Sequence, residues 1–259
     1  KPAAEVAAEH GKPSLLLGNN VLAHVPDIND FVGGMKTLLA KDGVITMEFP
    51  HLLRLMDENQ FDTIYHEHFS YLSFGTVRTI FFFFFFLLFD VDEVSTHGGS
   101  LRIFGCHADD SRAETPAVAK LLAGEKAFGL TTAATYGTFE AKVLETKRKL
   151  LAFLIDAKNA GKQIVGYGAP GKGNTLLNYC GIRTDFLDYT VDRSPHKQGR
   201  YTPGTHIPIL APEKIRETKP DYVLILPWNL KQEIATQNAY VREWGGRFVV
   251  PIPHVQLVD

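Results

Sequence analysis

Short apolar runs alternate along this chain with longer segments in which apolar residues recur at helical spacing. Short runs are typical of strands, whereas recurrence every three to four positions predicts helices with one buried face. Runs without alternating polar residues are typical of parallel strands that are covered on both faces. The pattern therefore predicts an α/β protein in which strands and helices alternate.

The first part of the chain, residues 1–110, predicts one such α/β region. We expect helices over 2–10, 30–40 and 52–59, strands over 14–17 and 44–49, and a further strand that contains Leu101, Arg102 and Ile103. The run at 14–17 is almost entirely apolar, so we expect a buried parallel strand there. Asp27 or Asn29 can cap the helix that follows, because either side-chain oxygen can accept a backbone N–H.

A mostly helical segment, residues 111–160, is expected to connect this region to a second one. Its clearest part carries an apolar stripe among lysines and glutamates, formed by Phe139, Val143, Leu150, Phe153 and Leu154. Residues 161–259 then predict strands over 163–168, 186–191, 207–210, 222–226 and 248–250, with helices between them. We therefore divide the chain into 1–110, 111–160 and 161–259.

The longest apolar run, Ile80 to Phe89, fits neither pattern. It contains six consecutive phenylalanines, Phe81 to Phe86, and shows neither strand alternation nor a helical stripe. It is about half as long as the ~20 residues that a membrane span requires. On a protein surface such a run would promote aggregation. We give it no functional weight.

The composition is that of an ordinary globular protein, with 45% apolar and 22% charged residues. A formal net charge of −2, without any basic run, argues against a nucleic-acid binder. Cys106 and Cys180 lie far apart, which excludes a disulfide framework and a cysteine-ligated zinc. We expect a reducing, cytoplasmic environment and see no signal-peptide pattern.

The stretch Tyr65-His66-Glu67-His68-Phe69 brings a phenol, two imidazoles and a carboxylate together. Histidine suits proton transfer near neutral pH, a carboxylate can orient it, and a phenol can hold an oxyanion. A strand would place His66 and His68 on one face, whereas a helical turn would bring Tyr65 and His68 together. Half of a zinc site and a plain surface loop are the alternatives to an acid–base role.

A glycine-rich turn opens the second region. Gly166, Gly168 and Gly171 fit the pattern G-x-G-x-x-G between a strand and a helix. Glycines permit the tight turn, and the helix N-terminus offers N–H groups to a diphosphate, to which Lys172 would add a charge. Asp192 follows the next strand, where an acidic residue meets a ribose hydroxyl in dinucleotide-binding folds. The turn therefore predicts nucleotide binding, with a plain structural turn as the alternative.

Polar residues also follow strands in the first region. Asn19, Asn20 and His24 come after the strand at 14–17, and ligands of open α/β sheets bind beyond the carboxyl ends of strands. A simple turn is the alternative for the two asparagines. Arg102 alternates with apolar neighbours, so it should lie on the opposite face of its strand from Leu101. It can bind a phosphate or carboxylate, or be a solvated strand charge.

Several motifs occur together, and in one order, along the chain. They are Asn19-Asn20-Val21-Leu22-Ala23-His24-Val25, Glu48-Phe49-Pro50, Tyr65-His66-Glu67-His68, His97-Gly98-Gly99-Ser100-Leu101-Arg102, Gly166-Tyr167-Gly168-Ala169 through Lys172-Gly173-Asn174, Asp192-Arg193-Ser194-Pro195 with Lys197, Pro203-Gly204-Thr205 and Pro227-Trp228-Asn229. In this combination the chain resembles the nucleotide-sugar C-methyltransferases. These enzymes use S-adenosylmethionine to methylate a carbon of a TDP-4-keto-sugar, and the resemblance covers nearly the whole chain.

The resemblance implies the C-terminal part of a Rossmann-type methyltransferase domain at 1–110 and a Rossmann-like nucleotide-sugar-binding domain at 161–259. It implies that His68 is the general base, with Tyr65 and Glu67 beside it and His24 in the same cleft. Asn19 and Asn20 are then expected to contact the methyl donor. Binding of the TDP-sugar is assigned by the same resemblance to His97, Ser100, Arg102, Gly168, Lys172, Asn174 and Asp192.

The chain also departs from the pattern of that family. It begins inside the methyltransferase domain, so we expect a fragment without the N-terminal zinc-binding module and without the glycine loop that cradles S-adenosylmethionine. We therefore expect zinc only in the missing module and an incomplete methyl-donor site here. The phenylalanine run replaces a mixed helix, and Pro170-Gly171 stands where the family tends to carry small residues such as alanine.

Two other functions stay open on the sequence. An NAD-dependent oxidoreductase would account for the glycine turn together with Asp192, and saturable NADH binding would favour it. A non-catalytic nucleotide-sugar-binding module would account for the second region alone, and measured affinity for the methyl donor would separate it from an enzyme.

Overall fold

The structure is a computed structural model that describes residues 1–258. The chain forms two compact units. Unit 1 comprises residues 1–57 and 66–137, and unit 2 comprises residues 58–65 and the chain from 138 onward. The short segment 58–65 therefore interrupts unit 1 in sequence but packs within unit 2.

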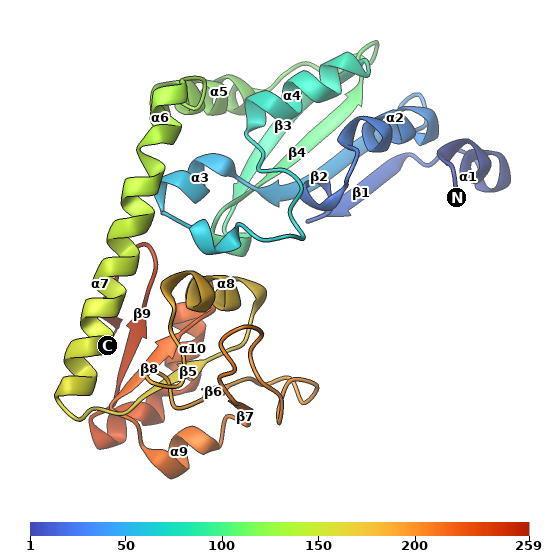
Figure 1. Cartoon of the computed structure of the whole chain (residues 1–259). Coiled ribbons are helices and arrows are strands. Elements are labelled where there is room, and N and C mark those ends of the chain that lie inside the picture. The colour runs from blue at the N-terminus through green and yellow to red at the C-terminus, as the bar shows by residue number, and fades with distance from the viewer. Residues whose placement is uncertain (259) are drawn as a thin grey trace. The chain divides into compact units, whose positions relative to one another are not determined.

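Unit 1 is built on a four-stranded mixed sheet in the order β1-β2-β4-β3 (Figure 1). β1 and β2 are parallel, whereas β4 runs antiparallel to both β2 and β3. The elements of this unit, with 3-10 turns labelled η, are α1 (Ala3–His10), β1 (Leu15–Asn19), η1 (Leu22–His24), α2 (Ile28–Leu38), β2 (Val44–Pro50), α3 (Leu52–Asp57), α4 (Phe74–Phe83), β3 (Phe86–Val94), η3 (Thr96–Gly98), β4 (Ser100–His107), α5 (Pro116–Phe128) and α6 (Ala133–Gly137).

One face of this sheet carries the core of unit 1. Ile45, Met47 and Phe49 alternate along β2 and are buried, and α2, α4 and α5 supply apolar residues to the same cluster. The two neighbours of Arg102 on β4 are fully buried, whereas the Arg102 side chain is 40% exposed. The alternation predicted for this strand is therefore confirmed. Asp27 caps α2, because its carboxylate accepts two backbone N–H groups at 3.0 Å.

β1 differs from its predicted environment. It is parallel, as expected, but it lies at the edge of the sheet, and Leu15 and Leu17 are 52% and 64% exposed. The expectation of a buried strand is wrong because the face that carries these two leucines is largely open among the described residues. An apolar run alone cannot show whether a layer covers both faces.

The phenylalanine run is divided between two elements. Helix α4 ends at Phe83 and strand β3 begins at Phe86. Phe81 and Phe86 are buried, with ring centres 5.8 Å apart. Three others are at least 70% exposed: Phe82, Phe83 and Phe85. Identical residues carry no periodicity, so the sequence pattern could not place this boundary.

Glu125 on α5 joins three parts of unit 1. Its carboxylate accepts hydrogen bonds from His51 Nε2 at 2.8 Å and from the backbone N–H groups of Phe74 at 2.6 Å and Gly75 at 2.9 Å. Burial opposes ionisation of this carboxyl, but the three hydrogen bonds outweigh it and hold the pKa of Glu125 below its ordinary value. The carboxylate therefore caps α4 and ties it to α5.

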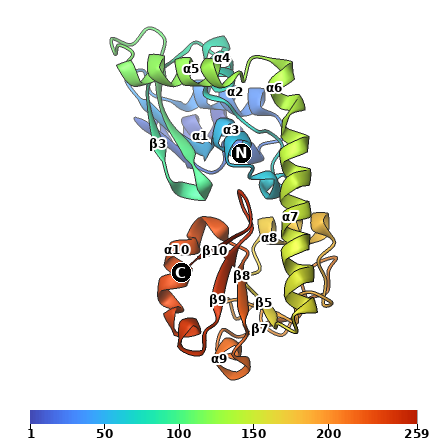
Figure 2. The same cartoon turned by 90° about the vertical axis from the view of Figure 1, so that its left-hand side faces the viewer.

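Unit 2 contains a six-stranded sheet in the order β10-β9-β8-β5-β6-β7, parallel except for β10. In Figure 2, α10 lies on one side of this sheet and α7 and α8 lie on the other. The elements of the unit are η2 (Phe61–Thr63), α7 (Phe139–Asn159), β5 (Ile164–Tyr167), α8 (Gly171–Cys180), β6 (Thr190–Val191), β7 (Ile209–Leu210), α9 (Lys214–Thr218), β8 (Tyr222–Ile225), η4 (Trp228–Leu230), α10 (Lys231–Gln237), η5 (Ala239–Trp244), β9 (Arg247–Val250) and β10 (Gln256–Val258).

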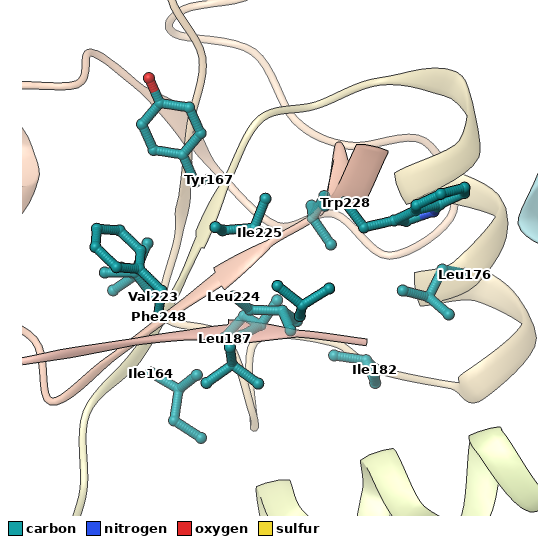
Figure 3. Packing of buried hydrophobic residues seen from close by; sticks show 14 of the residues in the cluster. Ile164, Tyr167, Leu176, Ile182, Leu187, Val223, Leu224, Ile225, Trp228 and Phe248 are labelled. Carbon is teal, nitrogen blue, oxygen red and sulfur yellow. The ribbon is translucent and has the colours of Figure 1, made fainter. Parts of the chain in front are cut away.

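The core of unit 2 lies around β5, β8 and β9. Figure 3 shows Ile164, Val223 and Phe248 packed together, with Leu176 of α8 and Trp228 at one end of the cluster. All of these except Trp228 are fully buried, and Trp228 is 6% exposed. These runs were predicted to be strands, and their burial on both faces is what a parallel sheet between helices requires.

Some predicted boundaries in this half of the chain shift. The strand expected over 186–191 is confined to Thr190–Val191, because Phe186 lies in a turn closed by a hydrogen bond to the Arg183 carbonyl. The helical segment 111–160 is shared between the units: α5 and α6 pack with unit 1, and α7 packs with unit 2. None of the helices in the described residues is both long and apolar enough to span a membrane.

Candidate functional site

The stretch 65–69 forms a turn and is neither a strand nor a helix. The division between the units falls inside it, since Tyr65 belongs to unit 2 and His66 begins the return to unit 1. His66 and Glu67 are exposed, whereas His68 is half-buried. Of the two geometries considered from the sequence, neither is adopted.

Unit 1 holds His68 beside His24. The backbone N–H groups of residues 69 and 70, at the end of the turn, donate to the Ala23 carbonyl at 2.8 and 3.2 Å. His24 Nδ1 donates to the Glu67 carbonyl at 2.8 Å, which leaves Nε2 as the nitrogen that can accept a proton. The His24 and His68 ring centres lie 4.7 Å apart, and Tyr71 meets His68 edge-on at 5.8 Å. Two imidazoles predicted from separate motifs are thus brought together.

Asn20 lies immediately after β1, at the carboxyl end of the strand. Its backbone adopts φ 55°, a left-handed conformation that asparagine tolerates better than most residues, and its N–H donates to the Glu48 carbonyl at 2.8 Å. The Asn20 side-chain oxygen is buried and has no hydrogen-bond partner among the described residues. Such an oxygen is unfavourable unless a bound molecule supplies a donor. Asn19, the last residue of β1, is exposed.

Glu48 is a buried carboxylate that the sequence interpretation did not include in the site. Its Oε1 accepts the Thr96 hydroxyl at 2.6 Å, and its Oε2 accepts Arg102 Nη2 at 2.8 Å. The hydrogen bond from Thr96, helped by Arg102, keeps the pKa of Glu48 below its ordinary value despite burial. A signal was present, because Glu48 interrupts an apolar strand and stands opposite Arg102 in the β2–β4 register.

The loop before β4 contains the other residues assigned to unit 1. His97 is exposed and adopts φ 56°, and Ser100 is buried with its hydroxyl donating to the Thr96 carbonyl at 3.0 Å. The Arg102 guanidinium pairs with Glu48, and the Ser100 hydroxyl donates to the Thr96 carbonyl. Both groups therefore have partners within unit 1. His97 is exposed and the Arg102 side chain is partly exposed, whereas Ser100 is buried.

In unit 2, the glycine turn lies where the strand order reverses. The chain runs from β5 outward to β6 and β7, then returns to place β8 on the other side of β5. Ligands of such sheets bind at this switch point, beyond the carboxyl ends of the two central strands. Gly168 adopts φ 87°, and a Cβ there would lie 2.6 Å from Pro227 Cδ, so the turn and the loop after β8 meet only because residue 168 is glycine.

Lys172 lies in the first turn of α8, facing the loop after β8. Its ammonium group donates to the Asn229 side-chain oxygen and lies 4.4 Å from the centre of the Trp228 ring. Burial lowers the pKa of Lys172, and the nearby Asp62 opposes this effect. The residue preceding α8, Pro170, provides no side-chain cap, so the N–H groups of the first turn are available to an anion. The Asn174 side-chain oxygen is buried without a partner among the described residues.

Asp192 has a structural role that the sequence did not indicate. One carboxylate oxygen accepts the Ala169 N–H at 2.8 Å and Lys197 Nζ at 3.2 Å, and the other accepts the Ser194 N–H at 2.9 Å. Burial opposes ionisation, but these bonds outweigh it and lower the pKa of Asp192. The carboxylate therefore braces the glycine turn from within unit 2.

A family model and a similar protein sequence agree with the motifs. The model of the C-methyltransferase C-terminal domain matches residues 95–253, and the chain belongs to this C-methyltransferase family. It is 39% identical over 255 residues to C-methyltransferase NovU of Streptomyces niveus, an alignment that covers 98% of this chain. The chain spans 61% of the length of that relative. A crystal structure of a Listeria monocytogenes protein assigned to the S-adenosylmethionine-dependent methyltransferases gives a TM-score of 0.31 at 13% identity, covering 41% of this chain and 67% of that one.

Proposed function

We propose that the full-length protein is an S-adenosylmethionine-dependent C-methyltransferase that acts on a TDP-4-keto-deoxysugar. The observation that carries the proposal is the pairing of His68 with His24 of η1, the turn that follows the carboxyl end of β1, in a chain that belongs to the C-methyltransferase family. Methylation at carbon requires a base that removes a C–H proton, and histidine is suited to that task near neutral pH.

His68 is the proposed general base. A keto group acidifies the hydrogen on the neighbouring carbon, so an imidazole nitrogen can take that proton while the electron pair moves toward the keto oxygen. The resulting enolate needs hydrogen-bond donors, and the hydroxyl of Tyr65 is proposed as one of them, whereas the Glu67 carboxylate can orient the imidazole. His24 holds the turn through the Glu67 carbonyl and so orients the base.

Unit 1 is proposed to supply part of the binding site for the methyl donor. S-adenosylmethionine would supply an electrophilic methyl group to the enolate carbon. Asn20 fits this role because its buried side-chain oxygen lacks a partner among the described residues, at the carboxyl end of β1. We propose that Asn19 and Asn20 contact the donor, and that His97, Ser100 and Arg102 lie toward the sugar substrate.

The nucleotide half of the substrate is proposed to bind unit 2. Gly168 and Lys172 place an uncapped helix N-terminus and an ammonium group at the switch point of the sheet. A diphosphate meets both requirements, because N–H groups and a point charge are what phosphate oxygens accept. Asn174 is proposed to bind the same ligand through its unpaired side-chain oxygen.

The structure bears on the dinucleotide alternative. In an NAD enzyme the acidic residue after the second strand binds the ribose, but Asp192 directs its carboxylate to Ala169, Ser194 and Lys197. We therefore propose that Asp192 supports nucleotide binding by bracing the turn.

Mass spectrometry tests the function as a whole: incubation of the full-length protein with a TDP-4-keto-deoxysugar and S-adenosylmethionine should add one methyl group to carbon. A nicotinamide-dependent redox product in place of the methylated one would reject it.

Replacing Lys172 with alanine should weaken TDP binding by about 10–150-fold, since a charge-assisted phosphate contact contributes roughly 1.5–3 kcal/mol. Calorimetric titration measures the change, and stability should change less than affinity. Lys158→Ala is the matched control, because Lys158 pairs with Asp188 at 3.0 Å on α7, away from the glycine turn. Unchanged TDP affinity in Lys172→Ala would rule out the phosphate role.

A further inference from the structure

Asp62 is a buried carboxylate beside the glycine turn of unit 2. It lies on η2 and is 0% exposed. Its Oδ2 accepts the indole N–H of Trp228 at 2.7 Å. Its Oδ1 is buried and has no hydrogen-bond partner among the described residues. A buried carboxylate with one bare oxygen is unfavourable as an anion, so something must compensate its charge.

The compensating group is Lys172. Trp228 connects the two residues physically, because its N–H binds Asp62 while the Lys172 ammonium group lies over its ring. Burial raises the pKa of Asp62 to about 7, with the Trp228 hydrogen bond and the Lys172 charge opposing that rise. The Cys180 thiol on α8 also interacts with Asp62, but burial raises its pKa to about 12, so it stays neutral. Lys172 is thus the charged partner that influences Asp62.

The same ammonium group is the one proposed to meet the diphosphate. An anion at the first turn of α8 would pair with the Lys172 ammonium group, which would then stabilise the Asp62 carboxylate less. The anion would also place further negative charge near Asp62. Both changes disfavour the carboxylate and favour the neutral acid. The segment that carries Asp62 also reaches this turn through Tyr65, whose ring lies 3.8 Å from the position that a Cβ on Gly171 would occupy.

We propose that Asp62 is a positioning residue of the nucleotide site: it holds Trp228 and Lys172 in the free protein and takes up one proton from solvent when a nucleotide diphosphate binds Lys172. The inference rests on the proposed assignment of Lys172 to the diphosphate. Because binding and protonation favour each other, nucleotide affinity falls as the pH rises through about 7, by at most tenfold per pH unit for one coupled proton.

Calorimetry with TDP-glucose tests the proton directly. The diphosphate of TDP-glucose has no group that titrates near neutral pH, so any proton taken up from solvent on binding is bound by a group of the protein. Titration between about pH 6 and 8.5, in buffers of different ionisation enthalpy, yields the number of protons bound. The parent protein should take up a fraction of a proton near pH 7.5. Asp62→Asn should take up none and should bind with an affinity that changes little with pH.

Two further variants provide a control and a second test of the role of Asp62. Asp188→Asn is the matched control, because Asp188 pairs with Lys158 and Gln163, and it should retain the parent proton uptake. Trp228→Phe keeps a ring beneath Lys172 but removes the N–H donor, so proton uptake should shift to higher pH. This variant decides the question if Asp62→Asn fails to fold, and a parent-like profile in it would overturn the inference.

The outcomes separate this inference from the function on which it rests. No TDP-glucose binding by the parent protein would reject the nucleotide site itself. Binding without proton uptake, or proton uptake that persists in Asp62→Asn, would reject the role of Asp62 and leave the nucleotide site standing.

Discussion

Replacing His68 with asparagine should slow exchange of the substrate's ring proton by about 10²–10⁴-fold, the usual cost of removing a general base. The exchanging proton lies on the carbon beside the keto group, and its loss from a TDP-4-keto-deoxysugar in deuterated solvent is followed by NMR. This step needs the base but no methyl donor. The fold and the affinity for the nucleotide should persist, because His68 is half-buried and its replacement remains polar.

His24 provides the control for this experiment, because the rings are 4.7 Å apart and either could reach the same carbon. In His24→Asn, the asparagine amide can still donate to the Glu67 carbonyl in place of Nδ1, so the turn stays in position while Nε2 is lost. We expect a modest effect there and none in His66→Asn, since His66 is exposed. Exchange at the parent rate in His68→Asn, with loss in His24→Asn, would make His24 the base.

Much of this architecture follows from local patterns in the sequence. The apolar runs at 44–49 and 222–226 predict strands, and both strands are central in their sheets. The glycine turn at 166–171 predicts a strand–turn–helix unit, and it forms at the switch point because Gly168 permits a close approach to Pro227. These features depend on residues close together in sequence, which is the information that periodicity and turn chemistry carry.

The contacts that complete the two sites depend on residues far apart in sequence. Asp62 and Trp228 are separated by 166 positions and meet only because segment 58–65 packs into unit 2. Nothing in the residues around Asp62 distinguishes it from a surface aspartate. Glu48 and Thr96 meet across 48 positions, although a charged residue within an apolar strand was a visible clue. Tertiary packing decides such contacts, and local patterns do not encode it.

Replacing Glu125 with alanine should destabilise unit 1 by about 3–5 kcal/mol, because it removes one acceptor from three donors at once. His51 and Phe74 are 2% and 0% exposed, so their N–H groups would be left buried without an acceptor. Glu114→Ala is the matched control. Its ion pair with Arg78 is half-exposed, and such pairs contribute at most about 1 kcal/mol.

The stability that Glu125 contributes should depend on pH, and its loss can be measured in unit 1 separately from unit 2. Since the pKa of Glu125 is lowered on folding from an ordinary value of 4.5, its added stability is present above about pH 4.5 and declines as the pH falls through the folded pKa. Hydrogen–deuterium exchange of peptides from α4 and α5 reports on unit 1. Fluorescence reports on unit 2, because both tryptophans, Trp228 and Trp244, belong to it. Faster exchange in α4 with unchanged fluorescence is expected, and exchange at the parent rate would show that this carboxylate does not hold α4 to α5.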